Sequence, residues 1–210
     1  MIKLIIADDH AIVREGLKQI LSANADMEVA GEAQNGQEVL DQISKKNFDV
    51  LLLDMSMPGL SGIDLIKRVK EKKPGIAILI LSMHQEDQFA VRALKAGASG
   101  YLTKDSASEL LVSALRRVAG GGKHISRTLA EKLAFEIDPY KETSPHEQLS
   151  NREFQVFRLI TEGKQINEIA ESLSLSPKTI STHKHRLMEK LNIRNNAELI
   201  QYAMNKRVFQ

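Results

Sequence analysis

The 210-residue chain has no cysteine, so it can form neither a disulfide nor a thiolate metal site. Its six histidines are scattered rather than grouped at metal-ligand spacing, and we do not expect structural zinc. No apolar run approaches the roughly 20 residues that cross a bilayer. The opening MIKLIIADD is too short and too quickly acidic for a secretory signal. These absences predict a cytoplasmic protein with no membrane partner.

Charge is distributed unevenly along the chain, although the formal net charge is only +2. The first 120 residues carry 15 Lys and Arg against 16 Asp and Glu, whereas residues 149 to 210 carry 10 against 6. A basic C-terminal part favours a polyanionic partner. The length exceeds that of a typical single domain and favours two domains.

Five short apolar runs in the first 120 residues predict strands. Runs of this kind are buried on both faces, which favours a parallel sheet covered by helices. Helical patterns lie between the runs and indicate five βα units. The predicted strands are KLIIAD (3–8), EVAGEA (28–33), DVLLLD (49–54), AILILS (77–82) and GYLTK (100–104).

Glycines at 120–122 close this α/β domain, because three glycines do not readily continue a helix. A connecting helix is predicted next, with Ser126 as its cap and Leu129, Leu133 and Ile137 along it. The sequence DPYKETSPHEQ (138–148) is typical of a polar linker. The predicted organisation is therefore a domain over 1–120, a linker with a helix over 121–147, and a second domain over 148–210.

The second domain is predicted to be all-α with four helices. Ser150 and Glu153 form a capping-box pattern at its first helix. Ser176, followed by Pro177, begins the third helix, and Asn195 or Asn196 begins the fourth. Helices over 166–173 and 177–191, joined by a short turn, have the proportions of a helix-turn-helix.

Acidic side chains follow two of the predicted strands. Asp8 ends the first predicted strand and Asp9 follows it, and Asp54 ends the third. In an open parallel sheet, ligands bind beyond the carboxyl ends of the strands, so these carboxylates are expected to converge. Three close carboxylates raise one another's pKa unless a cation neutralises them, and Mg²⁺ prefers oxygen ligands. A magnesium site is the natural prediction.

Ser82 and Lys104 end the fourth and fifth predicted strands and offer a donor and a cation for phosphoryl oxygens. An aspartate is a known covalent acceptor of phosphoryl groups. Taken singly, each residue has a simpler explanation, since a strand-end Asp is often a helix cap and a Lys is usually a solvated charge. Five such residues at the ends of four strands favour phosphate chemistry.

These motifs resemble the receiver domain of two-component response regulators, over about residues 1–120. The residues that carry the resemblance are Asp8-Asp9, LLLDMSMPG (51–59), Leu81-Ser82 and GYLTKD (100–105). The resemblance implies a doubly wound, flavodoxin-like parallel sheet of order 2-1-3-4-5.

The same resemblance implies a role for each site residue. Asp54 would accept the phosphoryl group from a sensor histidine kinase, and Mg²⁺ would be held by Asp8, Asp9, Asp54 and the Ser56 backbone carbonyl. Lys104 would pair with the phosphoryl oxygens. Ser82 would bond to one of them and move, and Tyr101 would be the aromatic that turns inward with it. From the residues alone, Tyr101 is equally well a half-buried strand aromatic.

The predicted helix over 177–191 has one apolar face and one polar face. A step of about 100° per residue from Ile180 places Leu187 and Leu191 on the buried side, with His183 more loosely there. The opposite side offers neutral groups for base edges with basic flanks for phosphates, as a major-groove helix requires. An ordinary solvated helix face remains the alternative. The polar side carries Lys178, Ser181, Thr182, His185 and Glu189.

Residues 149–203 resemble the four-helix DNA-binding domain of the LuxR type, so the whole chain resembles a NarL/FixJ-type response regulator. The resemblance implies base contacts by Ser181, Thr182 and His185, the last at a position where lysine or arginine is common. It also implies a dimer contact by the last helix, inverted half-sites in promoter DNA, and RNA polymerase as a partner. The implied backbone contacts are Lys164, Lys178 and Thr179.

The sequence therefore predicts a phosphorylation-activated, DNA-binding transcription regulator. It is not expected to be an enzyme beyond slow phosphoryl self-transfer and autodephosphorylation. One alternative is a small-molecule-gated LuxR-type regulator, which needs an apolar ligand cavity. The other is a Mg²⁺-dependent aspartyl-phosphate phosphatase, which needs a second acid two residues after Asp54, where Ser56 stands.

Overall fold

The computed structural model describes residues 1–60, 62–83, 88–135 and 144–209. It divides into two compact units, Met1–Leu133 and Ala134–Gln210. None of the helices in the described ranges combines the length and the apolar character that a membrane span requires.

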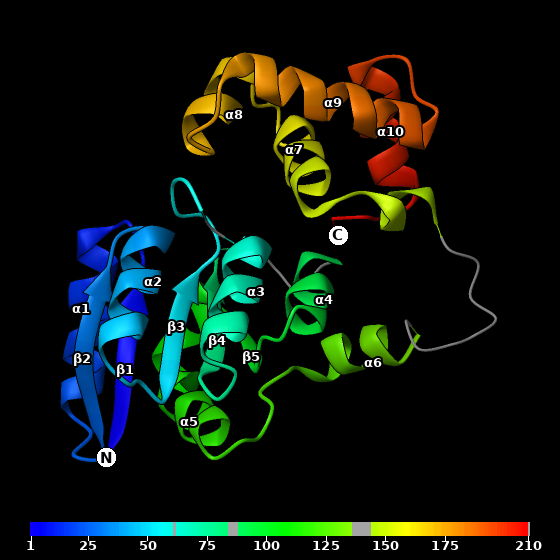
Figure 1. Cartoon of the computed structure of the whole chain (residues 1–210). Helices are drawn as coiled ribbons and strands as arrows, with labels where there is room; N and C mark the ends of the chain where they lie inside the picture. Colours follow the sequence, from blue (N-terminus) through cyan, green and yellow to red (C-terminus); the bar gives the residue numbers. More distant parts are fainter. Residues whose placement is uncertain (61, 84–87, 136–143, 210) are drawn as a thin grey trace. The chain divides into compact units, whose positions relative to one another are not determined.

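The first unit contains a five-stranded parallel sheet of order β2-β1-β3-β4-β5 (Figure 1). The predicted doubly wound order is confirmed. The strands are β1 (Ile2–Ala7), β2 (Met27–Ala33), β3 (Val50–Asp54), β4 (Ala77–Ser82) and β5 (Gly100–Thr103).

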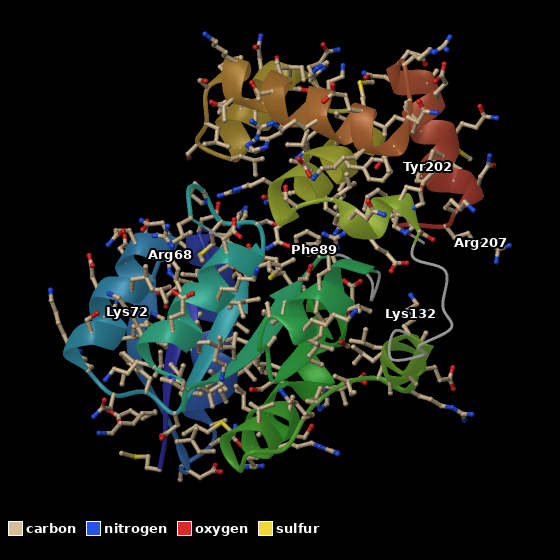
Figure 2. The ribbon with its side chains drawn as sticks, turned by 45° about the vertical axis from the view of Figure 1, so that its right-hand side comes forward. Arg68, Lys72, Phe89, Lys132, Tyr202 and Arg207 are labelled. Atoms are coloured by element: carbon tan, nitrogen blue, oxygen red, sulfur yellow. The ribbon has the colours of Figure 1, made fainter. Side chains whose placement is uncertain are left out.

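Helices cover both faces of this sheet, with α1 and α5 on one face and α2, α3 and α4 on the other (Figure 1). Strand residues such as Leu4 and Leu79 pack with Leu17 of α1 and Leu115 of α5 in a single apolar cluster. On the opposite side, Arg68 and Lys72 project from α3 to solvent (Figure 2). The helices are α1 (Ala11–Ser22), α2 (Gly36–Lys45), α3 (Gly62–Lys72), α4 (Gln88–Lys95) and α5 (Ala107–Ala119).

The two edges of the sheet differ from the simple prediction. Strand β2 is fully buried only at its ends, Met27 and Ala33, so burial of both faces was wrong for this edge strand. At the other edge, the segment after the glycines adds a short parallel bridge. The Tyr101 N–H donates to the His124 carbonyl and the His124 N–H donates to that of Ser99, each at 3.0 Å. This pairing covers backbone groups that β5 would otherwise leave open.

The connecting helix and the C-terminal helices also form. Helix α6 begins after Ser126, whose Oγ accepts from the Leu129 N–H at 3.1 Å, and the predicted helix position Ile137 lies outside the described residues. A short 3-10 helix precedes α7. The elements are α6 (Arg127–Phe135), the 3-10 helix (Pro145–Gln148), α7 (Asn151–Thr161), α8 (Ile166–Ser172), α9 (Pro177–Leu191) and α10 (Asn196–Asn205).

Side-chain caps fix where the C-terminal helices begin. The Ser150 N–H donates to Glu153 Oε2 at 2.8 Å while the Glu153 N–H donates to Ser150 Oγ at 3.3 Å, which confirms the capping box. Ser176 caps α9, with Pro177 at the first position. Of the two candidates for α10, Asn195 is the cap, and its Oδ1 accepts from the Glu198 N–H at 2.9 Å.

An aromatic cluster forms the core of the C-terminal unit. Phe157 lies 4.9 Å from Phe209 and 6.3 Å from Phe154 between ring centroids. Tyr202, which Figure 2 labels on α10, has its ring 6.3 Å from that of Phe157 between centroids, and its hydroxyl lies 2.9 Å from His146 Nδ1. The structure thus buries His146, which the sequence placed in a polar linker, because the imidazole finds a polar partner inside.

Candidate functional site

The three predicted carboxylates meet at the carboxyl end of neighbouring strands. Strands β1 and β3 pair with Ala7 opposite Leu53, so Asp8 and Asp54, the next residues on the two strands, come together. Ligand atoms of Asp8, Asp9, Asp54 and the adjacent His10 all lie within 4.8 Å of one another. Asp8 is 1% exposed and Asp54 is 3% exposed, whereas Asp9 faces solvent. Two carboxylates are therefore buried close together, where water does not screen their charges.

Lys104 supplies a positive charge to this cluster from the 3-10 helix Lys104–Ser106 that follows β5. Its Nζ lies 2.7 Å from Asp8 Oδ2 and 3.5 Å from Asp54 Oδ1. Burial opposes the ammonium charge, but the hydrogen bond to Asp8 and the nearby charge of Asp54 raise the pKa of Lys104 above its usual 10.5. One ammonium thus faces two buried carboxylates and cannot neutralise both.

Asp54 has one oxygen without a hydrogen-bond partner among the described residues, its Oδ2. Burial raises the pKa of Asp54 above its usual 3.8. The Lys104 charge opposes this rise, the Asp8 charge adds to it, and a hydrogen bond from the Ser56 N–H opposes it. The orphaned oxygen fits a carboxylate that awaits a cation or an electrophile.

Replacement of Asp54 by asparagine is expected to stabilise the fold at neutral pH without divalent cations. A raised folded-state pKa gives stability that is complete below about pH 3.8 and lost as the pH rises through the folded-state pKa. At pH 7, Asp54→Asn should raise the free energy of unfolding by about 1–3 kcal/mol, because a buried charge with an unmade hydrogen bond disappears. Urea unfolding followed by circular dichroism measures this.

The difference between Asp54→Asn and the original chain should shrink as the pH approaches 4. Asp41→Asn, which changes an exposed carboxylate of α2, is the matched control and should shift stability by less than about 0.5 kcal/mol. Equal or lower stability of Asp54→Asn at pH 7 would show that the Asp54 charge is already compensated.

The remaining predicted site residues of this unit lie in or just after the strands. Ser82 ends β4 and is buried, whereas Ser56, two residues beyond Asp54, is exposed. Tyr101 in β5 is 1% exposed, so the half-buried strand aromatic was wrong and the ring already lies inside the unit. Its role as a switch remains a prediction.

Two residues near Asp8 were missed from the sequence. His10 Nδ1 lies 3.2 Å from Asp8 Oδ1 and 3.1 Å from Asp9 Oδ1. Arg14, one turn into α1, donates from a guanidinium nitrogen to the Asp8 carbonyl at 2.8 Å and from Nε to Glu32 at 3.2 Å. The sequence signal for His10 is its position directly after two aspartates.

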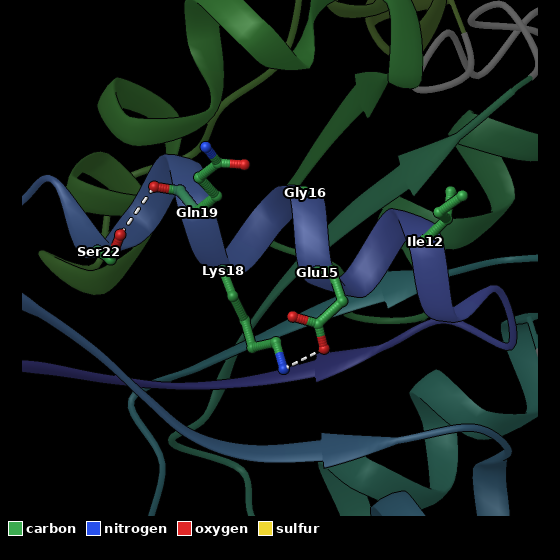
Figure 3. A pocket seen from close by; sticks show the side chains of 6 residues that line it. All are labelled: Ile12, Glu15, Gly16, Lys18, Gln19 and Ser22. Carbon is green, nitrogen blue, oxygen red and sulfur yellow. Dashed lines mark hydrogen bonds and ion pairs between the residues drawn. The ribbon is translucent and has the colours of Figure 1, made fainter.

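A separate shallow hollow runs along the outer side of α1 (Figure 3). It contains an ion pair between Lys18 Nζ and Glu15 Oε1 at 2.6 Å, and Ile12 at its edge is 86% exposed. None of the predicted site residues lines it. Its lining residues are Ile12, Glu15, Gly16, Lys18, Gln19 and Ser22.

In the C-terminal unit, α9 presents the predicted faces. Ile180, Leu187 and Leu191 are buried, and α9 packs against α7 and α8. The Nδ1 atom of His183 is buried without a hydrogen-bond partner among the described residues, and burial lowers the pKa of this imidazole below 6.5. His183 is therefore a packing residue, as predicted.

The polar side of α9 is available at the surface. Ser181 Oγ donates to the Pro177 carbonyl at 2.9 Å and Thr182 Oγ1 donates to that of Lys178 at 3.0 Å, which leaves their oxygens able to accept. His185 lies 3.4 Å from Glu189 in an exposed pair. Thr179 is only half-exposed and bonds to the cap residue Ser176. The exposed predicted contacts are Lys164, Lys178, Ser181, Thr182 and His185.

Each of the two units matches a known protein family. The family model described as response regulator receiver domain matches residues 4–116, and that of bacterial regulatory proteins, luxR family, matches residues 147–203. The chain belongs to the response regulators. It is 38% identical over 205 residues to the response regulator UvrY of Escherichia coli (strain K12), covering 97% of this chain and 94% of UvrY.

Solved structures of RcsB resemble this response regulator along its length. RcsB from Salmonella enterica serovar Typhimurium, bound to promoter P1flhDC in the presence of phosphomimetic BeF3⁻, is 31% identical with a TM-score of 0.68, covering 96% of this chain and 97% of RcsB. A structure of two RcsB dimers bound to two parallel DNAs is 32% identical with a TM-score of 0.60, covering 97% and 98%. The predicted resemblance to NarL/FixJ-type response regulators is thereby confirmed, because the chain combines a receiver domain with a LuxR-type domain.

Proposed function

We propose that a sensor histidine kinase phosphorylates this response regulator on Asp54, and that the phosphorylated form binds promoter DNA as a dimer to regulate transcription. One observation carries the proposal. Buried Asp54 presents an oxygen without a hydrogen-bond partner among the described residues, beside Asp8, Asp9 and the Lys104 ammonium. This is the arrangement that an acceptor of a dianionic phosphoryl group needs.

The residues at this site suit Mg²⁺. Carboxylate oxygens of Asp8, Asp9 and Asp54 lie close together, and the cluster has excess negative charge and an orphaned oxygen. These carboxylates, with the Ser56 backbone carbonyl, would hold the cation. Bound Mg²⁺ would neutralise the carboxylates and attract phosphoryl oxygens.

In the proposed transfer, Asp54 Oδ2 attacks the phosphorus of the kinase phosphohistidine. The new O–P bond forms as the N–P bond breaks, and the electron pair of that bond stays on the histidine nitrogen. Lys104, already within 3.5 Å of Asp54, pairs with a phosphoryl oxygen. Ser82 donates its hydroxyl to another oxygen, and Tyr101 follows that movement. A new dianion at the strand ends thus changes local packing.

The proposed output is DNA recognition by α9. Its exposed hydroxyl and imidazole groups are suited to base edges, and Lys178 and Lys164 are suited to phosphates. Base contacts by Ser181, Thr182 and His185 and a backbone contact by Thr179 complete the proposed interface. The DNA-bound RcsB structures support this output for a chain of the same architecture.

Dimerisation through α10 would place the α9 helices of the two protomers on inverted half-sites of the DNA. RNA polymerase is the expected partner at the promoter. The site of action is the cytoplasm. The proposed functional boundaries remain 1–120, 121–147 and 148–210. Apart from slow phosphoryl self-transfer and autodephosphorylation, no catalytic turnover is proposed. Against a phosphatase, the position two residues after Asp54 holds Ser56 rather than an acid.

The proposal is tested by treating the full chain with a small-molecule phosphodonor and Mg²⁺ and then measuring a DNA mobility shift. Phosphorylation should tighten binding to its promoter DNA. A chain that labels but binds DNA no differently would contradict phosphorylation-driven activation. A chain that does not label, yet binds DNA in response to a small apolar ligand, would instead support the ligand-gated alternative.

Substitutions on α9 should separate backbone contacts from base contacts. Lys178→Ala is expected to weaken binding to all DNA sequences alike and to flatten the slope of log affinity against log salt by about 1 unit. His185→Ala should instead reduce the preference for the cognate sequence, by about 1–3 kcal/mol. Fluorescence anisotropy with cognate and scrambled duplexes over a salt series measures both. An unchanged salt slope for Lys178→Ala would remove it from the phosphate contacts.

A further inference from the structure

The strand-end cluster contains an imidazole as well as carboxylates. His10 Nδ1 belongs to the set of ligand atoms within 4.8 Å of one another, together with oxygens of Asp8, Asp9 and Asp54. His10 precedes α1 as its N-cap residue, but its side chain makes no capping hydrogen bond. The ring is 64% exposed and is turned toward the two aspartates rather than used to begin the helix.

The distances around His10 match those between neighbouring ligands of one cation. Ligand atoms at adjacent corners of an octahedron with bonds of about 2.1 Å are about 3.0 Å apart, and opposite corners are about 4.2 Å apart. His10 Nδ1 lies 3.2 Å from Asp8 Oδ1 and 3.1 Å from Asp9 Oδ1. A contraction of a few tenths of an ångström would bring the widest pair of the cluster, at up to 4.8 Å, into the same range.

The surrounding contacts leave this arrangement open to a cation. Lys104 donates to Asp8 Oδ2. Asp8 Oδ1, the oxygen near the His10 ring, accepts one hydrogen bond from the His10 backbone N–H at 2.9 Å and keeps a second lone pair for a cation. Asp54 is 3% exposed, and its Oδ2 has no hydrogen-bond partner among the residues the structure describes. An orphaned buried oxygen on a carboxylate of this cluster is an independent sign that a ligand completes it.

We propose that His10 is a nitrogen ligand of the cation site, so that the site binds a divalent first-row transition cation more tightly than Mg²⁺. Imidazole favours such cations, whereas Mg²⁺ favours oxygen ligands and water. The inference rests on the cation site of the proposed function and adds to it a residue that sets metal preference. Mg²⁺ binds through the carboxylates alone, and the transition cation binds through the carboxylates and the ring.

The test uses the full-length, tag-free chain, with Ni²⁺ and Mg²⁺ titrated separately by calorimetry. His10→Asn removes the imidazole while keeping a good N-cap for α1, and His10→Ala removes all side-chain donors. Asp54→Asn, which removes one carboxylate of the cluster, shows whether the Ni²⁺ binding depends on this site rather than on histidines elsewhere. We expect His10→Asn and His10→Ala to weaken Ni²⁺ binding at least tenfold, since even supporting residues of metal ligands contribute about 10–100-fold. Mg²⁺ binding should stay close to that of the original chain.

Three outcomes would overturn the inference. Unchanged Ni²⁺ binding in both variants would show that the ring stays outside the site. An equal loss of both metals would show that His10 only orients the aspartates. Tighter binding of both metals would show that the ring competes with the cation. The proposed function fails separately, if the original chain neither binds Mg²⁺ nor labels with a phosphodonor.

Discussion

Asp54→Asn is expected to accept no phosphoryl group from a small-molecule phosphodonor in the presence of Mg²⁺. The amide nitrogen and oxygen are poor nucleophiles, and no other carboxylate of the cluster combines burial with an oxygen that lacks a hydrogen-bond partner among the described residues. Asp8 is equally buried, but its Oδ2 is held by Lys104 at 2.7 Å and its Oδ1 accepts from the His10 N–H at 2.9 Å. Intact-protein mass spectrometry measures the label.

The matched control is Asp49→Asn, which changes another strand-end carboxylate of the same unit. Asp49 lies at the opposite end of β3, where its Oδ2 accepts from the Lys3 N–H, and it should label like the original chain. Asp54→Asn keeps the side-chain volume and is expected to be the more stable protein, so loss of label would not reflect unfolding. Undiminished labelling of Asp54→Asn would refute Asp54 as the acceptor.

Phe157→Ala is expected to destabilise the C-terminal unit by about 3–5 kcal/mol, the cost of truncating a buried aromatic side chain. Phe157 is fully buried, and its ring packs on those of Phe154, Tyr202 and Phe209. Phe157 lies on α7, which packs against α9 and α10. Loss of its ring should therefore also destabilise α9, the helix proposed to recognise DNA. Such a cost is a large share of the 5–15 kcal/mol that stabilises a typical domain.

Two measurements define this result. Urea unfolding should give a lower transition for the C-terminal unit, and DNA binding should fall with it, while phosphodonor labelling of the receiver domain persists. Phe157→Leu, which keeps most of the apolar volume, should lose much less stability. A fully stable Phe157→Ala would contradict the packing described for this core, and joint loss of labelling would show that the two units do not fold separately.

The sequence was sufficient to locate the site residues that stand at strand ends. Because parallel strands deliver their carboxyl ends to one edge, the positions of Asp8, Asp54 and Lys104 after apolar runs were enough to predict their convergence. The first residues of helices could also be predicted from the sequence, since Ser150 and Glu153 form their capping hydrogen bonds within one helical turn. Local signals of this kind need no knowledge of tertiary contacts.

Features that depend on tertiary contacts were not accessible in the same way. The burial of His146 depends on a hydroxyl 56 residues away, and the exposure of β2 depends on its place at the sheet edge. Tyr101 is 1% exposed, and the outer edge of its strand β5 pairs with the distant segment at His124. His10 was overlooked for a different reason, since its partners are aspartates rather than other histidines.

The most direct test of the account is to locate the phosphoryl group on the unaltered chain. Labelling with a phosphodonor, reduction of the acyl phosphate with borohydride and peptide mass spectrometry identify the acceptor residue. The account predicts that the modification falls on Asp54 and that chelation of divalent cations prevents it. Modification of another residue, or equal modification of Asp54 without a divalent cation, would contradict it.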